Sequence, residues 1–458
     1  MKKTLLKRLL SLGLAVSMLF GFTACQGKSA YEIAQETQNF QGTKEEWLQS
    51  LKGADGKDAA KLTIQEIYQA SGYQGTLQEF IKDYLEIEIF ETNETSILSK
   101  NVLSVMSVVC AFNVQKQTGE NWFGKPEYKD SIQSSGGSAV ILKLDKENGN
   151  ATLITNYHVV YDSSSTNKNG ISNSIWVYPY GGYIGYNSQT GVDESGKGIQ
   201  AFYVGGAMDY DIAVLEIKGS EVLKNSIVEE AVLGDSEEIA LGEKTFVIGN
   251  AEADGISVTS GVLSAQSEYI DMYSFDGQKR EVEFRVMRTS AAVNHGNSGG
   301  GMFNAYGQLI GMVNAKNVED DVENMGYALP INHVIQVVNN ILDNHGVLKR
   351  ALFGVKVQTI DSYPCYDEKG NLKIVETIQV YEPATQDASS YNKLQKGDIF
   401  KTIQVGEKVY PITRMYTVND VLLGVRLGDS VVVTVERNGV DVPITIKFDK
   451  QSYFTVYA

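Results

Sequence analysis

Three cysteines, four histidines and seven prolines are few for a chain of 458 residues, and each scarcity narrows what the protein can be. Cys110 and Cys365 lie far apart in the sequence, which argues against a disulfide framework and predicts small, buried side chains instead. The sequence has no Cys/His spacing typical of a metal site, no Gly-rich phosphate loop and no dinucleotide fingerprint. We therefore predict neither a metal nor another cofactor.

Positive charge is also scarce, because 40 Lys and Arg residues stand against 56 Asp and Glu residues and give a net charge of −16. An acidic chain without a basic patch is a poor partner for the phosphate backbone of a nucleic acid. The same deficit argues against polybasic attachment to anionic lipid. An apolar content of 43% with 21% charged residues excludes a wholly disordered or fibrous chain, and the length predicts two to four domains.

The chain begins with a basic segment that contains Lys2, Lys3, Lys7 and Arg8, and an apolar run follows over residues 9–22. That run is too short to span a bilayer comfortably. The order of these features is typical of a secretory signal peptide, which we expect over residues 1–24. A buried core helix is the alternative.

Phe22-Thr23-Ala24-Cys25 follows the apolar run and resembles the lipobox of bacterial lipoproteins, in which the cysteine is lipidated and becomes the mature N-terminus. Phe22 departs from this pattern, which usually has Leu or another aliphatic residue there. The resemblance implies lipidation of Cys25 and an extracytoplasmic protein, lipid-anchored to the bacterial cell membrane. Ordinary signal cleavage after the small residues would instead leave Cys25 as a free thiol.

Residues 25–100 contain a loose repeat, since residues 40–48 are similar to residues 73–81. In each copy a Thr is followed three residues later by a Glu, a capping box that predicts the start of a helix. We expect a small helical repeat region that acts as a spacer. A module that binds a ligand or the cell wall is the alternative.

From residue 101 the chain is rich in short β-branched runs separated by Gly, Asn, Asp and Ser, a pattern that predicts strands joined by turns. The clearest runs cover residues 104–112, 138–144, 152–155, 212–217, 245–248 and 308–313. Many short strands favour a barrel or a sandwich. Residues 162–200, rich in Ser, Asn, Gly and Tyr, are predicted to form a long loop region.

Helical spacing of apolar residues returns over residues 334–342 and ends at Asn344-His345-Gly346, a C-cap signal. This predicted helix separates the β-rich body from a strand-rich last segment, in which residues 430–437 and 443–448 are the clearest strands. We therefore place a domain boundary between residues 101–347 and residues 348–458.

The turn Gly296-Asn297-Ser298-Gly299-Gly300 is a candidate nucleophile turn. An acyl-transfer nucleophile must protrude from a tight turn, and glycines on both sides allow the φ angles that such a turn demands. They also keep side chains away from backbone N–H groups that would meet a developing oxyanion. Because Gly-Asn-Ser-Gly is ordinary loop chemistry as well, the turn becomes informative only with partners.

Among the four histidines, His158 is the best placed as a general base, because it directly follows an apolar strand. His333 and His345 flank the predicted helix and are expected to be solvated or capping. His295 adjoins the turn of Ser298 and is expected to be a loop residue or to face the substrate. A structural histidine that caps a strand is the alternative for His158.

Asp211 is the leading candidate for the carboxylate that orients this histidine, because it opens the strongly apolar run of residues 212–215. Asp209 is the competitor. The order His158, Asp211, Ser298 is that of the chymotrypsin fold and differs from the orders in subtilisin and the α/β-hydrolases. The three residues together predict a Ser-His-Asp site.

With these motifs in place, the body of the chain resembles the HtrA/Deg family of trypsin-like serine proteases. The matching stretches, in family order, are residues 137–141, 155–160, 211–215, 233–236, 247–250, 288–292, 296–300, 307–313 and 326–331. The resemblance implies a mainly β fold with a chymotrypsin-like double β-barrel. It also implies His158 as the base, Asp211 as its orienting acid and Ser298 as the nucleophile.

The same resemblance implies an oxyanion hole made by the backbone N–H groups of Gly296 and Ser298, and a shallow apolar specificity pocket lined by residues 310–315. Two positions depart from the family pattern, because His295 and Gly301 replace the prolines that usually flank the turn. Both changes loosen the backbone. We therefore expect the oxyanion turn to be less pre-organised in the resting protein.

The last segment resembles a PDZ domain, as the family leads one to expect. Leu352-Phe353-Gly354-Val355 matches the loop in which successive backbone N–H groups bind a terminal carboxylate. Residues 394–399 match the turn before a later strand, whereas residues 361–392 diverge. The resemblance implies that Leu352, Phe353, Gly354 and Val355 bind peptide C-termini.

Together these features predict an ATP-independent serine endopeptidase of extracytoplasmic protein quality control or signalling, which cleaves unfolded or misfolded protein segments. The family also implies a homotrimer. The first alternative is a peptide-binding or chaperone lipoprotein with an inactive protease body, which the changes at His295 and Gly301 leave open. The second is a surface adhesin that uses the N-terminal repeats.

Overall fold

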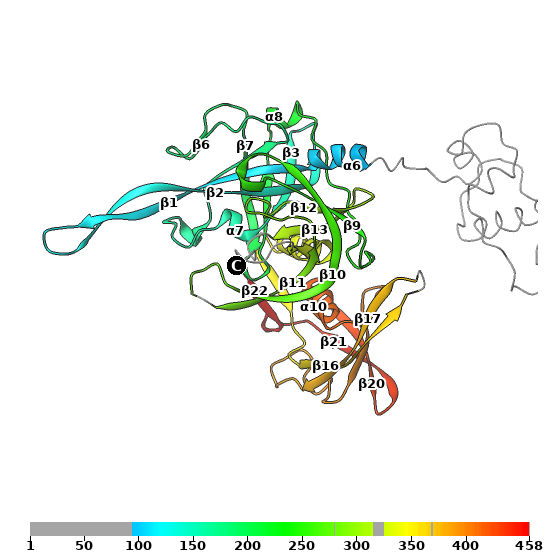
Figure 1. Ribbon diagram of the computed structural model, residues 1–458. Coiled ribbons are helices and arrows are strands. Elements are labelled where there is room, and N and C mark those ends of the chain that lie inside the picture. The colour runs from blue at the N-terminus through cyan, green and yellow to red at the C-terminus, as the bar shows by residue number, and fades with distance from the viewer. Residues whose placement is uncertain (1–93, 279, 315–324, 368–369, 458) are drawn as a thin grey trace, which may run out of the picture. The chain divides into compact units, whose positions relative to one another are not determined.

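The computed structural model describes residues 94–278, 280–314, 325–367 and 370–457 (Figure 1). The chain divides into two compact units, residues 1–92 and residues 93–458, and the described residues belong to the second. The predicted signal peptide, Cys25 and both copies of the repeat lie outside the described residues. The first described element is helix α6 (Glu94–Asn101), which lies at the end of the predicted helical region.

Six antiparallel strands close into a first barrel in the order β1-β2-β3-β8-β7-β4. The strands are β1 (Val105–Glu120), β2 (Pro126–Asp145), β3 (Asn150–Thr155), β4 (Ser174–Pro179), β7 (Ile199–Ala207) and β8 (Ile212–Ile217). Apolar side chains such as Phe112, Leu153 and Leu215 fill its interior. The outer parts of β1 and β2 continue past the barrel as a long hairpin (Figure 1).

A second closed barrel has the strand order β10-β11-β14-β13-β12-β9. Its strands are β9 (Lys244–Gly249), β10 (Ser257–Tyr273), β11 (Glu281–Thr289), β12 (Gly301–Asn304), β13 (Leu309–Asn314) and β14 (Gly326–Pro330). Strands β12, β13 and β14 are buried along their whole length, because they carry apolar or small residues almost throughout. The two barrels confirm the predicted mainly β, chymotrypsin-like architecture.

The prediction of a continuous loop over residues 162–200 is wrong in part. β4 lies within this range and closes the first barrel by pairing with β1 and β7. Two short strands, β5 (Tyr186–Asn187) and β6 (Val192–Asp193), pair with each other beside it. β4 has only two buried aliphatic residues, Ile175 and Val177, among polar and aromatic neighbours, so its hydrophobic alternation was too short to stand out.

Helix α9 (Ile331–Asp343) follows the second barrel and ends as its C-cap signal predicted. His345 and Gly346 have φ angles of 56° and 95°, and the Gly346 N–H donates to the carbonyl of Ile341 at 2.8 Å. This left-handed C-cap provides a hydrogen-bond donor for a carbonyl that the last helical turn would leave unpaired. The helix buries Val334, Val337 and other apolar residues in the same core as the second barrel.

The chain from Leu348 onward forms two further sheets. A two-stranded sheet pairs β15 (Leu348–Ala351) with β22 (Phe454–Tyr457), near the end of the chain. The larger sheet, which we call the C-terminal sheet, has the order β16-β17-β18-β20-β21, with β19 paired to β18. Its strands and its helix are β16 (Lys356–Tyr366), β17 (Leu372–Glu382), β18 (Ile399–Val405), β19 (Lys408–Pro411), α10 (Met415–Leu423), β20 (Ser430–Arg437) and β21 (Val440–Lys447).

Three smaller findings complete the fold. Cys110 is buried in the first barrel as predicted, whereas Cys365 lies half-buried on β16, and both thiols are free. Burial raises the pKa of the Cys110 thiol well above that of an ordinary thiol. Within the described ranges, no helix is both long enough and apolar enough to cross a bilayer.

Candidate active site

The three predicted site residues come from the ends of strands in both barrels. His158 lies in the short helix α7 (Tyr157–Val160), which begins two residues after β3 ends. Asp211 lies between the turn η3 (Met208–Tyr210) and β8. Because β3 and β8 are paired and Thr155 lies opposite Ala213, His158 and Asp211 emerge at the same end of the first barrel. Ser298 comes from the second barrel, in the turn between β11 and β12.

These three side chains form one hydrogen-bonded row. His158 Nε2 lies 2.9 Å from Ser298 Oγ, and His158 Nδ1 lies 2.8 Å from Asp211 Oδ2. His158 is nearly buried and Asp211 is fully buried, so little water competes for these bonds. In this geometry the imidazole can take a proton from the serine hydroxyl while the carboxylate holds the ring and stabilises its charged form.

The Asp211 side chain accepts from donors on two elements. His158 donates its backbone N–H to Oδ1 at 3.0 Å, and the side chain of Asn314 donates to Oδ2 at 3.0 Å. Asn156 donates to the backbone carbonyl of Asp211 at 3.0 Å. A fully buried carboxylate is tolerated only when hydrogen bonds replace its hydration. These contacts therefore hold the carboxylate with both oxygens close to His158 Nδ1, Oδ1 at 3.0 Å and Oδ2 at 2.8 Å.

Asp209, the competing carboxylate, lies elsewhere. It forms a partly exposed ion pair with Arg280, whose Nη1 lies 3.0 Å from Asp209 Oδ2. A hydrogen bond to this carboxylate raises the pKa of Arg280. The structure thus brings Asp211, and not Asp209, to His158.

Glycine is required at two positions of the Ser298 turn. Gly296 has a φ of 89°, and a Cβ atom built there would lie 2.2 Å from the carbonyl oxygen of Asn250. Gly299 has a φ of 82°, and its Cβ would lie 2.1 Å from the carbonyl oxygen of Ser138. Both sites combine a left-handed backbone with neighbouring main chain, so any side chain would displace the turn.

Ser138 of β2 ties the turn to the first barrel. Its hydroxyl donates to the Gly296 carbonyl at 2.8 Å and accepts from the Asn250 N–H at 2.8 Å. Its backbone N–H donates to the Ser298 carbonyl at 2.8 Å. One residue of the first barrel therefore holds both sides of the nucleophile turn.

The two positions that depart from the family pattern are also held in place. The exposed His295 accepts a hydrogen bond at its carbonyl from the Glu252 N–H at 2.7 Å. Gly301 begins β12 and lies opposite Ile248 and Met312 in the sheet. A Cβ at Gly301 would lie 2.4 Å from the Phe303 ring, so glycine makes room for that side chain.

Sequence reasoning missed several residues that support the row. Asn314 contacts Asp211, and the Phe275 ring lies 5.3 Å from the His158 ring between centroids. Asn314 belongs to the predicted specificity segment, of which residues 310–314 are buried in β13 and Ala315 lies outside the described residues. Phe275 lies in the connection between β10 and β11, where the sequence gives no spacing signal that could have identified it.

His333, which was expected to be solvated or capping beside the helix, is instead buried within α9. Its Nδ1 lies 2.8 Å from Asp420 Oδ1 on helix α10. His345 is exposed, in agreement with its prediction. Among the described residues, no group of three or more His, Cys, Asp and Glu side chains is arranged to hold a metal ion.

The chain is similar in sequence to known serine proteases. Residues 137–312 match the trypsin-like peptidase domain family, and the match spans all three residues of the hydrogen-bonded row. The chain is 29% identical over 373 residues to the serine protease Do-like HtrA of Bacillus subtilis (strain 168), with 79% of this chain and 75% of that protein covered.

Two further comparisons extend the likeness. The chain is 31% identical over 331 residues to the serine protease Do-like HtrB of the same organism, with 69% of this chain and 62% of that protein covered. Among solved structures, the HtrA-type protease AlgW with tripeptide has a TM-score of 0.49 and 22% identity, and 80% of this chain and 98% of that chain are covered.

Proposed function

We propose that this chain, a serine endopeptidase whose relatives support the HtrA/Deg family, acts outside the cytoplasm and cleaves unfolded or misfolded proteins without ATP. The observation that carries the proposal is the hydrogen-bonded row of Ser298, His158 and Asp211. In this assignment Ser298 is the nucleophile, His158 is the general base and Asp211 is its orienting acid.

The distances support a two-stage acyl transfer. Ser298 Oγ attacks the scissile carbonyl carbon while His158 Nε2, 2.9 Å away, takes the hydroxyl proton. The backbone N–H groups of Gly296 and Ser298 are proposed to donate to the oxyanion that forms. The imidazolium, stabilised by Asp211, then protonates the leaving amine, and a water molecule activated by His158 releases the acyl group.

An active-site fluorophosphonate reagent tests this assignment directly. We expect the wild type to be labelled on Ser298, Ser298→Ala to remain unlabelled, and Asp211→Asn to react more slowly by about 10⁴-fold. Peptide mapping by mass spectrometry locates the label. Ser104→Ala is the matched control, because Ser104 is a buried serine whose hydroxyl donates to the carbonyl of Asn101 and has no histidine partner.

Two outcomes would count against the assignment. A folded wild-type protein that is not labelled would favour the alternative, a peptide-binding lipoprotein with an inactive protease body. Labelling of Ser298→Ala at the wild-type rate would show that the reactive residue lies elsewhere.

We also propose that residues 348–458 form a PDZ-like domain that binds peptide C-termini. In the loop Leu352-Phe353-Gly354-Val355, the hydroxyls of Ser389 and Ser390 donate to the carbonyls of Leu352 and Phe353 at 2.7 and 2.8 Å. Within the described part of the chain, the N–H groups of Phe353, Gly354 and Val355 have no hydrogen-bond partner. Three successive free donors support capture of a terminal carboxylate.

The strand that follows this loop supports the same role. Among the described strands, β16 lies at an edge of the C-terminal sheet, because it pairs there with β17 alone. Most of its residues are exposed, so its free edge can accept an extended peptide as an additional strand. A ligand would then place its carboxylate at the loop and its backbone along β16.

Gly354→Ala is expected to weaken binding of a fluorescent peptide with a free apolar C-terminus by tenfold or more. Gly354 has a φ of 81°, and its added Cβ would lie 2.3 Å from the Cβ of Ala388, so the loop must shift. Gly397→Ala is the matched control, because Gly397 has a φ of 94° but no atom within 4 Å of its added Cβ. Fluorescence anisotropy measures both. Equal affinity of the wild type for the free-acid and amidated peptides would refute carboxylate capture.

The location outside the cytoplasm rests on the sequence before residue 94. Lipidation of Cys25 would leave the chain lipid-anchored to the cell membrane, with residues 26–93 between the anchor and the described unit. The basic segment, the apolar run and the small residues before Cys25 support this proposal. The homotrimer that the family implies stays a prediction.

Fatty-acid incorporation tests the anchor in the producing bacterium. We expect the wild type to incorporate labelled fatty acid and to fractionate with membranes, and Cys25→Ala to lose both properties. Cys365→Ala is the control, because Cys365 is a free and half-buried cysteine, whereas Cys110 is buried. Membrane association of Cys25→Ala at the wild-type level would rule out this anchor.

A further inference from the structure

Tyr210, the residue immediately before Asp211, is held on three sides by residues from much later in the chain. Its ring stacks on His333 at 5.5 Å between centroids and 24° between planes. The ring of Tyr457 meets it edge-on at 5.3 Å and 89°. Arg350 Nη1 donates to the Tyr210 hydroxyl at 2.9 Å. Aromatic pairs at these distances and a charge-assisted hydrogen bond are directional contacts, so together they fix the ring in one orientation.

Two of the three contacts come from α9 and β15, which lie between the second barrel and the C-terminal sheet, and the third comes from β22, which follows that sheet and pairs with β15. His333 lies in α9, Arg350 in β15 and Tyr457 in β22, where Tyr457 is paired opposite Leu348. The last strand of the chain thus packs against the residue that precedes the proposed catalytic acid. Burial raises the pKa of Tyr210 well above that of an ordinary phenol, so this hydroxyl stays neutral.

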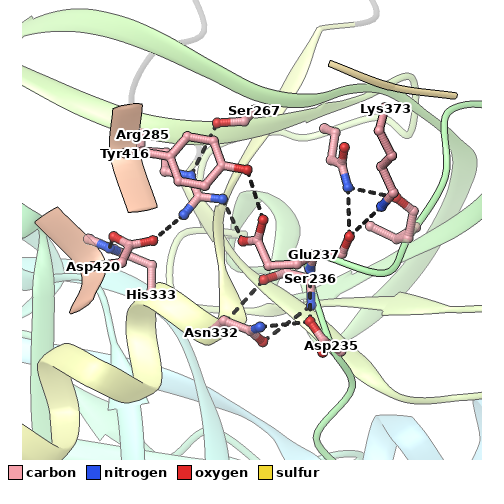
Figure 2. Close-up of polar contacts among 12 residues, drawn as sticks. Asp235, Ser236, Glu237, Ser267, Arg285, Asn332, His333, Lys373, Tyr416 and Asp420 are labelled. Carbon is pink, nitrogen blue, oxygen red and sulfur yellow. Dashed lines mark hydrogen bonds and ion pairs between the residues drawn. The ribbon is translucent and has the colours of Figure 1, made fainter. Parts of the chain in front are cut away.

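His333 is itself fixed from helix α10 through a buried charge cluster (Figure 2). Asp420 of α10 binds His333 and also forms an ion pair with Arg285 of β11. Arg285 is 6% exposed, and its guanidinium lies 3.4 Å from the centre of the Tyr416 ring and forms a second ion pair with Glu237 at 2.6 Å. Burial alone would lower the pKa of Arg285, but Asp420 and Glu237 raise it, so Arg285 stays charged.

This cluster has only a narrow range of acceptable geometries. A buried guanidinium must keep its carboxylate partners, because leaving one charge unpaired in the interior is strongly unfavourable. Tyr416 adds a hydrogen bond from its hydroxyl to Glu237 Oε2 at 2.8 Å. These ion pairs and hydrogen bonds therefore fix helix α10 against β11. Asp420 in turn fixes the ring of His333 against Tyr210.

The backbone at Asp211 explains why its neighbour matters. Asp211 has a φ of 51°, a left-handed conformation that residues other than glycine adopt only when their surroundings enforce it. Its N–H donates to the carbonyl of Met208 at 3.1 Å, which closes the η3 turn over Tyr210. The direction of the Asp211 side chain therefore depends on how firmly that turn is held.

We propose that Tyr210 is a positioning residue for Asp211, and that His333, Arg350 and Tyr457 hold it, so that the end of the chain takes part in aligning the proton-transfer row. This inference rests on the proposed role of Asp211 as the partner of His158. It assigns Tyr457 a role in turnover, although Tyr457 contacts none of the three proposed catalytic residues.

Tyr457→Leu in the full chain tests the inference with a soluble peptide substrate. We expect kcat to fall about tenfold and KM to change by less than twofold, because substrate contacts are untouched. We also expect the acid limb of the kcat/KM profile to move to lower pH, because a displaced carboxylate stabilises the imidazolium of His158 less well. Tyr457→Phe, which keeps the ring, should restore both properties.

Two controls separate positioning from a general loss of stability. Tyr183→Leu removes a tyrosine that is 72% exposed and should leave kcat and the acid limb unchanged. Fluorophosphonate titration gives the concentration of active sites, so a partly unfolded variant would show fewer sites with an unshifted acid limb. If wild type neither turns over substrate nor reacts with the probe, the proposed function itself fails, which is a different result.

The inference is overturned if folded Tyr457→Leu keeps the wild-type kcat and acid limb, or if Tyr457→Phe is as impaired as Tyr457→Leu. Should Tyr457→Leu fail to fold, His333→Leu gives the same test, because it removes the ring stacked on Tyr210 and leaves the Arg285–Asp420 ion pair in place. An unchanged acid limb in folded His333→Leu would also overturn it.

Discussion

The buried carboxylate of Asp211 is the constraint on which the arrangement of the site depends. A charge with no solvent exposure needs donors in place of water, and here His158 and Asn314 supply them from different barrels. The left-handed backbone of Asp211 adds a second demand, because such strain persists only where neighbouring structure enforces it. Residues of both barrels, and by our inference residues near the end of the chain, meet these two requirements at Asp211.

Because of this constraint, the two barrels contribute different residues to the site. The first barrel provides His158 and Asp211 on paired strand ends, and the second provides Ser298 and Asn314. Ser138 of the first barrel forms hydrogen bonds with the Ser298 turn of the second barrel. Each such bond contributes about 0.5–1.5 kcal/mol, so the alignment depends on several modest contacts rather than on one strong contact.

Much of this arrangement could be predicted from the sequence. Runs of β-branched residues indicated six of the twelve barrel strands, and the order of three residue types around a glycine-flanked serine identified the row. β4 could not be predicted, because its burial depends on the partner strands that close the barrel and not on its own composition. His333 was expected to be solvated or capping, and its burial could not be predicted because its partner Asp420 lies 87 residues away in the sequence. The role of Asn314 is likewise a long-range contact that no local pattern reports.

Proton NMR of the resting protein, with 15N in the histidine rings, tests the central claim most directly. The account predicts a far-downfield proton attached to His158 Nδ1, produced by its 2.8 Å contact with Asp211, and predicts its loss in Asp211→Asn. A similar signal from His333 against Asp420 should remain in that variant and serves as the internal reference. A folded wild type without the His158 signal, or an Asp211→Asn variant that keeps it, would contradict the account.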